Sequence, residues 1–329
     1  MNNLFESHDF YAEKAAVPSL LKWGDPEACP APRVTVIMPV YKRPEFFAKA
    51  LRSVLAQDYA DSYEVVVVDN NQDTASPNQA VVEQMADPRV RYYRNAENLG
   101  MYQNWNRGIE LARAPYVTFC HDDDLLLPGA LRILMQLAPI TGKACVLSAY
   151  HTIDGAGNMT GTQGQYHRHG FLKPRKLARY TKLGQYLGNV SCGDGCLYHR
   201  QSMLDLGGYD ATRYPVADYA LHVLYARRFG AWICNEPTSC YRIADNESMQ
   251  VYELFPGAIR ALHACMRQEK TMMDRVAGPL VQALDHDNQL LYRRFWSGSS
   301  GRALSMKDRC VLWVARKVNL LNKFTVSGR

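Results

Sequence analysis

The sequence predicts an α/β protein with a mainly parallel sheet, helices on both faces of that sheet, and a helical region at the C-terminal end. Short β-branched runs alternate with amphipathic segments through the first 140 residues. Polar residues follow most of these runs directly, as at the carboxyl ends of parallel strands. Right-handed crossovers between parallel strands place the connecting helices on both faces of the sheet.

Four strand–helix units account for the first half of the chain. Apolar runs predict strands at residues 34–38, 64–68, 90–93 and 116–120. Helical patterns begin at Pro44, end at Met85, cover residues 101–112 and begin again at Ala130. The second run is apolar without alternation, which is typical of a strand buried on both faces. The first 32 residues are expected to form an irregular leader that ends in a proline-rich stretch.

The second half of the chain is less regular. Residues 143–150 predict a strand, and the glycine-rich stretch 154–170 predicts a flexible loop with three histidines in or beside it. Loops of this length in compact domains are usually functional or disordered. Helical patterns recur at residues 200–206 and 219–229, and a final pair of strands is expected at residues 231–234 and 238–243.

Composition indicates a globular protein with a full core. Apolar residues make up 47% of the 329 positions and charged residues 21%. The nine cysteines show no repeated C-x-x-C pairing, so reduced core thiols are expected rather than a zinc site. The N-terminal residues do not resemble a signal peptide, and no run of about 18 apolar residues predicts a membrane span. A cytoplasmic protein is therefore expected.

Three polar stretches are expected to meet at one edge of the sheet. PVYKR, DNNQD and HDDD follow the first, second and fourth strands. Ligands of open α/β sheets bind outside the carboxyl ends of the strands, so these stretches predict a single site. No G-x-G-x-x-G follows the first strand and no P-loop motif occurs, which disfavours dinucleotide and P-loop phosphate sites.

The unusual feature of the site is the acid triplet Asp122, Asp123 and Asp124, flanked by apolar residues on both sides. Adjacent carboxylates in a half-buried setting raise one another's pKa unless a positive charge lies among them. A hard divalent cation, Mg2+ or Mn2+, would supply that charge. The alternative is a strand end with three acids, one of which caps the following helix.

Five segments in order resemble the family 2 glycosyltransferases of the GT-A fold. The resemblance covers about residues 33–245. The segments are VTVIMPVYKRP, EVVVVDNNQDT, NLGMYQNWNRGIELARAPYVTFCHDDD, LGGYD and ADYALHVLYARRFG. It implies a GT-A, Rossmann-like sheet and an inverting transfer of a sugar from a nucleotide-diphosphate donor.

The resemblance also implies roles for residues around a nucleotide-sugar donor. Asp69 would accept a hydrogen bond from the base, most often uracil, while Tyr41 supplies a ring face and Arg43 a charge near the diphosphate. The implied nucleotide-sugar-binding residues are Pro39, Tyr41, Arg43, Asp69, Asn98, Gly100, Asn106, Asp122 and Asp194. Of these, Asn98, Gly100 and Asn106 would shape the turn and helix beside the nucleotide, and Asp194 would contact the acceptor or donor sugar or simply form a turn.

Two further roles follow from the resemblance. The family register makes Asp123 the metal-binding carboxylate with Asp124 beside it, whereas a literal D-x-D reading pairs Asp122 with Asp124. The Mn2+ or Mg2+ would stabilise charge on the departing nucleotide diphosphate. Asp218 would be the general base that removes the proton of the acceptor hydroxyl, although a helix-capping role is the alternative.

The sequence departs from the family pattern at several positions. Lys42 stands where the family has Asn, Trp105 where many members have Arg, and Ala217 where an acid is usual. The motif Y-R-x-H, whose histidine can bind the metal, reads YRIAD here, so Ala244 replaces that histidine and Asp245 is a substitute ligand to consider. A histidine one helical turn beyond Asp218 is expected to be a core or surface residue.

The C-terminal tail carries the positive charge. The net charge is +6, and residues 290–329 hold nine basic residues and one acid. Arg309, Arg316 and Lys323 recur every seven residues beside an apolar helix face, which predicts an amphipathic helix over residues 302–329 that binds an anionic membrane surface. The alternative is a helix packed on the catalytic domain. Nucleic-acid binding is disfavoured because the tail lacks base-stacking platforms.

Together these features predict three regions and one activity. The regions are an N-terminal leader at 1–32, a GT-A domain at 33–248 and a helical C-terminal region at 249–329. The expected activity is a metal-dependent hexosyl transfer from a nucleotide-sugar, a UDP-sugar above all, to a glycan or lipid-linked oligosaccharide acceptor in cell-surface polysaccharide synthesis. The location is then the cytoplasm, with peripheral association at the inner face of the membrane. The alternative is a catalytically inactive nucleotide-sugar-binding module.

Overall fold

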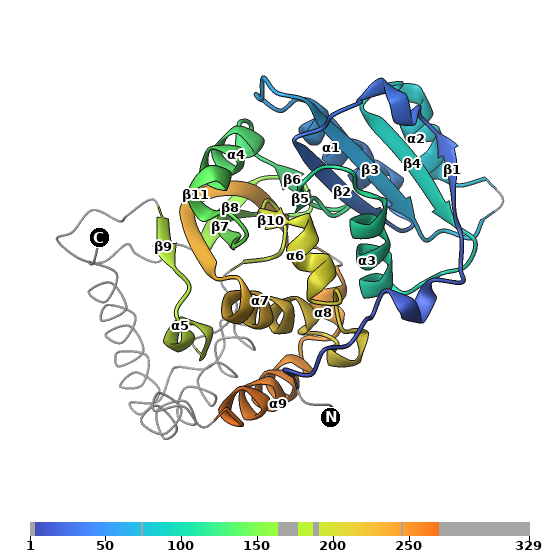
Figure 1. The fold of residues 1–329 in the computed structure, drawn as a ribbon. Helices are drawn as coiled ribbons and strands as arrows, with labels where there is room; N and C mark the ends of the chain where they lie inside the picture. The colour runs from blue at the N-terminus through green and yellow to red at the C-terminus, as the bar shows by residue number, and fades with distance from the viewer. Residues whose placement is uncertain (1–3, 74, 164–176, 187–190, 245, 270–329) are drawn as a thin grey trace.

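The computed structural model of the protein describes residues 4–73, 75–163, 177–186, 191–244 and 246–269 (Figure 1). Two sheets form its centre. The first has the order β1-β4-β3-β2-β5-β10 and the second the order β6-β11-β7-β8, with β9 also paired to β11. The strands of the first sheet are β1 Ser19–Trp23, β2 Val34–Val40, β3 Tyr63–Asp69, β4 Val90–Asn95, β5 Tyr116–Phe119 and β10 Tyr198–His199.

The four inner strands of the first sheet are parallel, which confirms the predicted strand–helix alternation. α1 (Pro44–Leu55) and α2 (Pro77–Met85) pack with one set of core residues, whereas α3 (Met101–Leu111) packs with Ile37 and Val117 on the other face. The strands are fully buried over β2 and β3 because helices cover both faces. This arrangement brings the carboxyl ends of β2, β3 and β5 to one edge.

The second sheet lies against the first, and its main pair is parallel. Its strands are β6 Leu125–Leu126, β7 Cys145–Ile153, β8 Met159–Gln163, β9 Leu177–Arg179 and β11 Ala231–Arg242. The helices of this half are α4 Ala130–Thr141, α5 Lys182–Tyr186, α6 Arg200–Asp205, α7 Ala217–Arg228, α8 Glu247–Gln250 and α9 Phe255–Arg267. Short 3-10 helices occur at Ala12–Lys14, Pro26–Ala28 and Ala211–Arg213.

The predicted irregular leader is wrong. Residues Ser19–Trp23 form β1, which pairs antiparallel with β4 at the edge of the first sheet. Residues before β1 also form hydrogen bonds with the rest of the domain. The Tyr11 hydroxyl donates to the Met203 carbonyl at 3.2 Å, and Arg107 donates to the Val17 carbonyl at 2.7 Å. Residues 4–32 are therefore part of the folded domain.

Two other predictions need correction. The expected loop at 154–170 contains the strand β8, which pairs with β7, and residues 164–176 lie outside the described part. The expected final pair of strands is one strand, β11, whose pairing with β7 shifts register around Pro237. The shift accommodates a proline that has no N–H to donate to the sheet.

The C-terminal predictions are tested only in part. The proposed boundary at residue 248 falls inside α8, and α9 packs against α7 through residues such as Ile259 and Leu262. Residues 270–329, including the basic amphipathic segment, lie outside the described part of the chain. Among the described residues no helix combines the length and apolar character needed to span a membrane. The eight cysteines of the described residues are thiols rather than disulfides, and seven of them are buried, as predicted for core thiols.

Candidate active site

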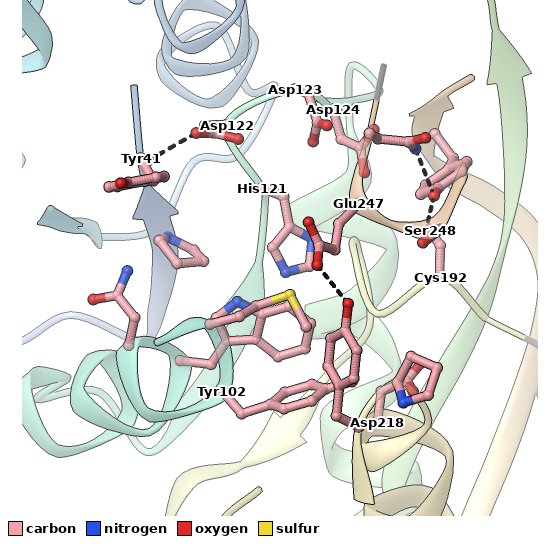
Figure 2. A pocket seen from close by; sticks show the side chains of 18 of the residues that line it. Tyr41, Tyr102, His121, Asp122, Asp123, Asp124, Cys192, Asp218, Glu247 and Ser248 are labelled. Atoms are coloured by element: carbon pink, nitrogen blue, oxygen red, sulfur yellow. Dashed lines mark hydrogen bonds between the residues drawn. The ribbon is translucent and has the colours of Figure 1, made fainter. Parts of the chain in front are cut away.

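A cavity of about 720 Å³ opens where the carboxyl ends of β2, β3 and β5 meet. Figure 2 shows the acid triplet along one side of this cavity, with Asp218 at the other end of the view. The predicted site residues that line it are Pro39, Tyr41, Arg43, Asn98, Gly100, Asp122, Asp123, Asp124 and Asp218. The structure therefore brings together side chains from residues 39 to 218 that the sequence predicted to meet at one edge.

Each acid of the triplet has a different partner. The backbone N–H of Tyr41 donates to Asp122 Oδ2 at 2.9 Å. Arg43 Nη1 lies 2.5 Å from Asp123 Oδ2 in an ion pair. Asp124 is buried, and its Oδ1 accepts from the backbone N–H of Arg242 at 2.7 Å. These contacts fix the loop between β5 and β6 against the end of β2.

Arg242 is a supporting residue that the sequence analysis missed. Its guanidinium is buried, donates to the carbonyl of Asp123 at 2.7 Å through Nε, and lies over the ring of Phe46. Nη1 also donates to the Asp154 carbonyl at 2.9 Å. The side chain of Arg242 therefore fixes the backbone of the loop that carries the three acids, and its backbone N–H binds the carboxylate of Asp124.

His121 is the second missed residue, and it explains the position of Asp194. Asp194 has no exposed surface and does not belong to the cavity lining. Its Oδ1 accepts from the backbone N–H of His121 at 2.7 Å, and its Oδ2 lies 2.8 Å from His121 Nδ1. The predicted sugar contact of Asp194 therefore needs correction: Asp194 orients His121, whose ring packs 4.5 Å from the ring of Trp105.

The acids are crowded enough to change one another's ionisation. Burial, and then the charge of Asp123, raises the pKa of Asp122 to about 7. Burial also raises the pKa of Asp124, and the charge of Asp194 adds to that effect. Burial opposes charge on His121, but the neighbouring Asp194 carboxylate raises the pKa of its imidazole overall. Full ionisation of these acids is therefore unfavourable without a further positive charge.

This donor set fits a divalent cation. His121, Asp124 and Asp194 offer ligand atoms that lie within 4.8 Å of one another. His121 Nε2 is buried and has no hydrogen-bond partner among the described residues. Carboxylate oxygens with a single imidazole suit Mg2+ or Mn2+, and a cation would remove the repulsion that raises the pKa of Asp122.

Asp218 is the second residue of α7, and its half-buried side chain faces the cavity. The hydroxyl of Tyr102 accepts a hydrogen bond from the backbone N–H of Ala217 at 3.4 Å, beside Asp218. Burial, followed by the charge of Asp218, raises the pKa of Tyr102. His222, one turn further along α7, is fully buried against the hydroxyl of Tyr198, so of the two expected settings, core or surface, it has the core one.

Two predicted residues lie behind the cavity wall. Asp69 is fully buried, and its Oδ2 accepts from the hydroxyls of Ser76 and Tyr92 at 2.6 and 2.5 Å. The next residue, Asn70, lines the cavity instead. Asn106 is also buried and exchanges two hydrogen bonds with the backbone of Tyr209, so it holds the LGGYD turn. Neither side chain belongs to the lining of this cavity.

The turn before α3 matches its predicted shape. Asn98 accepts a hydrogen bond from the backbone N–H of Gly100 at 2.9 Å. Gly100 has φ +79°, a conformation that favours glycine, and both residues are exposed at the cavity. The open end of the cavity is completed by residues that no sequence motif indicated, among them Tyr214, Glu247, Ser248, Val251 and Phe255.

Comparisons with known proteins show that the sequence is similar to glycosyltransferases. The sequence model of the family described as "Glycosyl transferase family 2" matches residues 35–207. The GalNAc(5)-diNAcBac-PP-undecaprenol beta-1,3-glucosyltransferase of Campylobacter jejuni is 38% identical over 110 residues, which cover 32% of this chain and 35% of that protein. This chain spans 60% or less of the length of the curated relatives it matches.

Two solved structures share the fold at low sequence identity. TarS 1–349 of S. aureus, solved with UDP-GlcNAc, is 15% identical with a TM-score of 0.57, over 88% of this chain and 81% of that one. A mannosyltransferase from Pyrobaculum calidifontis, solved with GDP-Man and Mn2+, is 15% identical with a TM-score of 0.53, over 96% and 88% of the two chains. These similarities confirm the predicted GT-A fold class.

Proposed function

Because the chain belongs to glycosyl transferase family 2, we propose that it transfers a hexose, with inversion, from a nucleotide-diphosphate sugar to a hydroxyl group of a glycan or lipid-linked acceptor. The observation that carries the proposal is one cavity lined by Arg43, the acid triplet and Asp218. A role in cell-surface polysaccharide synthesis is supported by the Campylobacter jejuni relative, whose name specifies an undecaprenol-linked glycan.

The nucleotide is proposed to bind at the end of β2. Tyr41 is 44% exposed at the cavity and offers a ring face to a base. Arg43 offers charge to the diphosphate, in exchange for its ion pair with Asp123. The exposed turn at Asn98 and Gly100 and the side chain of Asn70 complete this side. A UDP-sugar is the proposed donor, and the complex of TarS with UDP-GlcNAc supports that choice.

Asp122, Asp123 and Asp124, with His121 beside them, are the residues proposed to hold Mn2+ or Mg2+. The bound ion would act as a Lewis acid toward the charge of the departing nucleotide diphosphate. The fold neighbour from Pyrobaculum calidifontis was solved in complex with GDP-Man and Mn2+. In this chain Arg242 keeps the backbone of Asp123 and Asp124 fixed, so that the carboxylates are pre-positioned.

Asp218 is the proposed general base. It accepts the proton of the acceptor hydroxyl while that oxygen forms a bond to C1 of the donor sugar. The bond between C1 and the phosphate oxygen breaks at the same time, and the nucleotide diphosphate leaves with the electron pair. Attack from the face opposite the leaving group inverts the configuration at C1.

The test is a panel of nucleotide-sugars scored by release of free nucleotide diphosphate, with and without Mn2+ or Mg2+ and with lipid-linked acceptors. The wild-type chain is expected to release the diphosphate from at least one donor only when the ion is present. Asp123→Ala and Asp218→Asn are each expected to lower kcat by a factor of about 100 or more. Asp58→Asn, which changes a carboxylate on the exposed surface, is the matched control.

The alternative function gives a different result in the same assay. A catalytically inactive nucleotide-sugar-binding module would bind a donor, as seen by calorimetry, and release no nucleotide diphosphate under any condition in the panel. That outcome would overturn the proposed transfer while leaving donor recognition by the cavity intact.

A further inference from the structure

The first turn of α3 places a buried tyrosine, Tyr102, in the wall of the cavity. Tyr102 is the second residue of α3, and it lines the cavity although only 4% of its surface is exposed. In Figure 2 its ring extends from α3 toward Asp218 of α7. Gly100, on the side of the cavity proposed for the nucleotide, lies only two residues earlier in the chain. Tyr102 therefore connects the donor side of the cavity with the proposed base.

Neighbouring aromatic side chains fix the ring of Tyr102. The ring packs edge-on against Trp105 at 5.0 Å and against Tyr214 at 6.4 Å, and it lies nearly parallel to Tyr209 at 6.0 Å. Aromatic pairs prefer such edge-on and offset arrangements. A side chain enclosed in this way loses little further freedom when a ligand binds, so the Tyr102 hydroxyl is already in position before binding.

The hydroxyl of Tyr102 contacts the helix that carries the proposed base. Its oxygen accepts a hydrogen bond at 3.4 Å from the backbone N–H of Ala217, the first residue of α7. The N-cap residue Val216 makes no side-chain bond to this helix end, so the hydroxyl satisfies one of its N–H groups. Within the described residues this is the only hydrogen bond of the hydroxyl, and in it the oxygen is the acceptor. The hydroxyl hydrogen is therefore left for a ligand or a water molecule.

We propose that Tyr102 binds the acceptor sugar: its hydroxyl donates a hydrogen bond to the acceptor hydroxyl next to the one that Asp218 deprotonates. The inference rests on the proposed transfer for the presence of an acceptor and for the role of Asp218. The Tyr102 hydroxyl lies beside the helix start that carries Asp218, so one sugar ring spans both side chains. A buried group that pairs with a sugar hydroxyl disfavours an analogue without that hydroxyl, because the protein group is then left unpaired.

The decisive experiment measures binding and does not require turnover. Methyl glycosides of glucose, galactose, mannose and N-acetylglucosamine are titrated against the full chain in the presence of UDP, with NMR as the readout. At least one glycoside is expected to bind the wild type. Tyr102→Phe is expected to weaken that glycoside about fivefold, because phenylalanine keeps the ring packing and removes one hydrogen bond.

Monodeoxy forms of the same glycoside then identify the hydroxyl that Tyr102 binds. One of them is expected to bind the wild type about fivefold more weakly than its parent glycoside does. The same deoxy form should bind Tyr102→Phe as well as the parent does, because the contact is already missing from that variant. This comparison is a double-mutant cycle between protein and ligand, and it isolates the one contact.

Tyr225→Phe is the matched control. Tyr225 is buried in α7 outside the cavity lining, and its hydroxyl also accepts a backbone N–H, that of His199 at 3.0 Å. The control variant loses the same kind of bond to the backbone, so it is expected to lose stability and to bind the glycoside as the wild type does. UDP affinity should stay within about twofold in both variants, because the nucleotide side of the cavity is unchanged.

The outcomes distinguish the two proposals. The acceptor contact is overturned if no glycoside binds, if Tyr102→Phe binds as tightly as the wild type, or if every deoxy form has the same effect on both proteins. An equal loss of glycoside binding in Tyr225→Phe would also overturn it, because destabilisation alone would then explain the loss. Failure of every nucleotide-sugar to release a nucleotide diphosphate overturns the transfer reaction instead, and the titration still decides whether Tyr102 binds a sugar.

Discussion

His222 lies one helical turn beyond Asp218 but belongs to the core rather than to the cavity. Its Nε2 is 2.8 Å from the hydroxyl of Tyr198, and burial lowers the pKa of its imidazole to about 3. An exposed imidazole has a pKa of about 6.5. Between these two values the unfolded chain binds a proton that the folded chain excludes, so acid favours unfolding.

This difference predicts the pH dependence of stability. The free energy of unfolding is expected to fall as the pH drops below about 6.5, with a contribution from His222 of roughly 1 kcal/mol per pH unit down to about pH 3. His222→Gln should remove that contribution, so its urea-unfolding curve should shift less between about pH 7 and about pH 5 than that of the wild type. His8→Gln at an exposed position is the control. Equal shifts in wild type and His222→Gln would contradict the assignment.

The site could be predicted from sequence where a motif also fixes side-chain direction. The acid triplet, Arg43 and Asp218 all reach the cavity because each lies at the end of a strand or the start of a helix. Asp69 is the last residue of β3, and strand side chains alternate between faces. A difference of one position therefore decides which side chain lines the cavity, and in this structure Asn70 lines it while Asp69 does not.

Other site residues left no signal that a single sequence reveals. The pairing of His121 with Asp194 joins residues 73 positions apart, and Glu247 reaches the cavity only through the packing of α8. A lone histidine or glutamate at such positions is indistinguishable from a surface residue until the fold brings its partner close.

At the scale of elements, the turn between α6 and α7 is a closely packed junction. Gly208 has φ +83°, and a Cβ there would lie 2.6 Å from Asn106 Oδ1 and 2.9 Å from Tyr11 Cζ. Three elements therefore meet at this residue: the N-terminal segment, α3 and the LGGYD turn. Close packing of this kind admits only glycine.

Gly208→Ala is accordingly expected to destabilise the protein by about 2 to 4 kcal/mol, through backbone strain and the displacement of Asn106. Gly257→Ala is the matched control, since no atom lies within 4 Å of its Cβ position in α9. It should leave stability unchanged or raise it by up to about 1 kcal/mol. Urea unfolding measures both, and equal stability of the two variants would contradict this account of the junction.

The central strands and helices could be predicted from the sequence, whereas the edge strand β1 and the continuous strand β11 could not. The central strands β2 and β3 are mostly apolar and are buried along their whole length because two layers of helices cover them. β1 is an edge strand with Leu20 and Leu21 exposed, so burial leaves little pattern in SLLKW. The two strands predicted at residues 231–234 and 238–243 form one strand, because β11 continues past Pro237 with a shift in its register.

At the scale of the whole molecule, the basic tail, residues 302–329, is predicted to bind an anionic membrane surface. Arg309, Arg316 and Lys323 are each expected to contribute about 1 kcal/mol of attraction to anionic lipid. Changing all three to Gln should lower binding to anionic vesicles roughly a hundredfold, as measured by sedimentation, and leave the weak binding to neutral vesicles unchanged. Lys22, Lys49 and Lys143, which are exposed on the described domain, provide a triple-Gln control. Undiminished sedimentation of the tail variant would rule out the tail as the anchor.

The two sides of the cavity come from separate stretches of the chain. The residues proposed for the nucleotide and the metal end at position 124, whereas Asp218, proposed as the base for the acceptor hydroxyl, lies much later in the chain. Genetic recombination that exchanges only the later stretch with that of a relative would therefore yield chimeras that keep one activated sugar and attach it to a different recipient. The recipient of the sugar could then change through exchange of the later part of the gene, while the earlier part keeps the residues proposed to bind the donor.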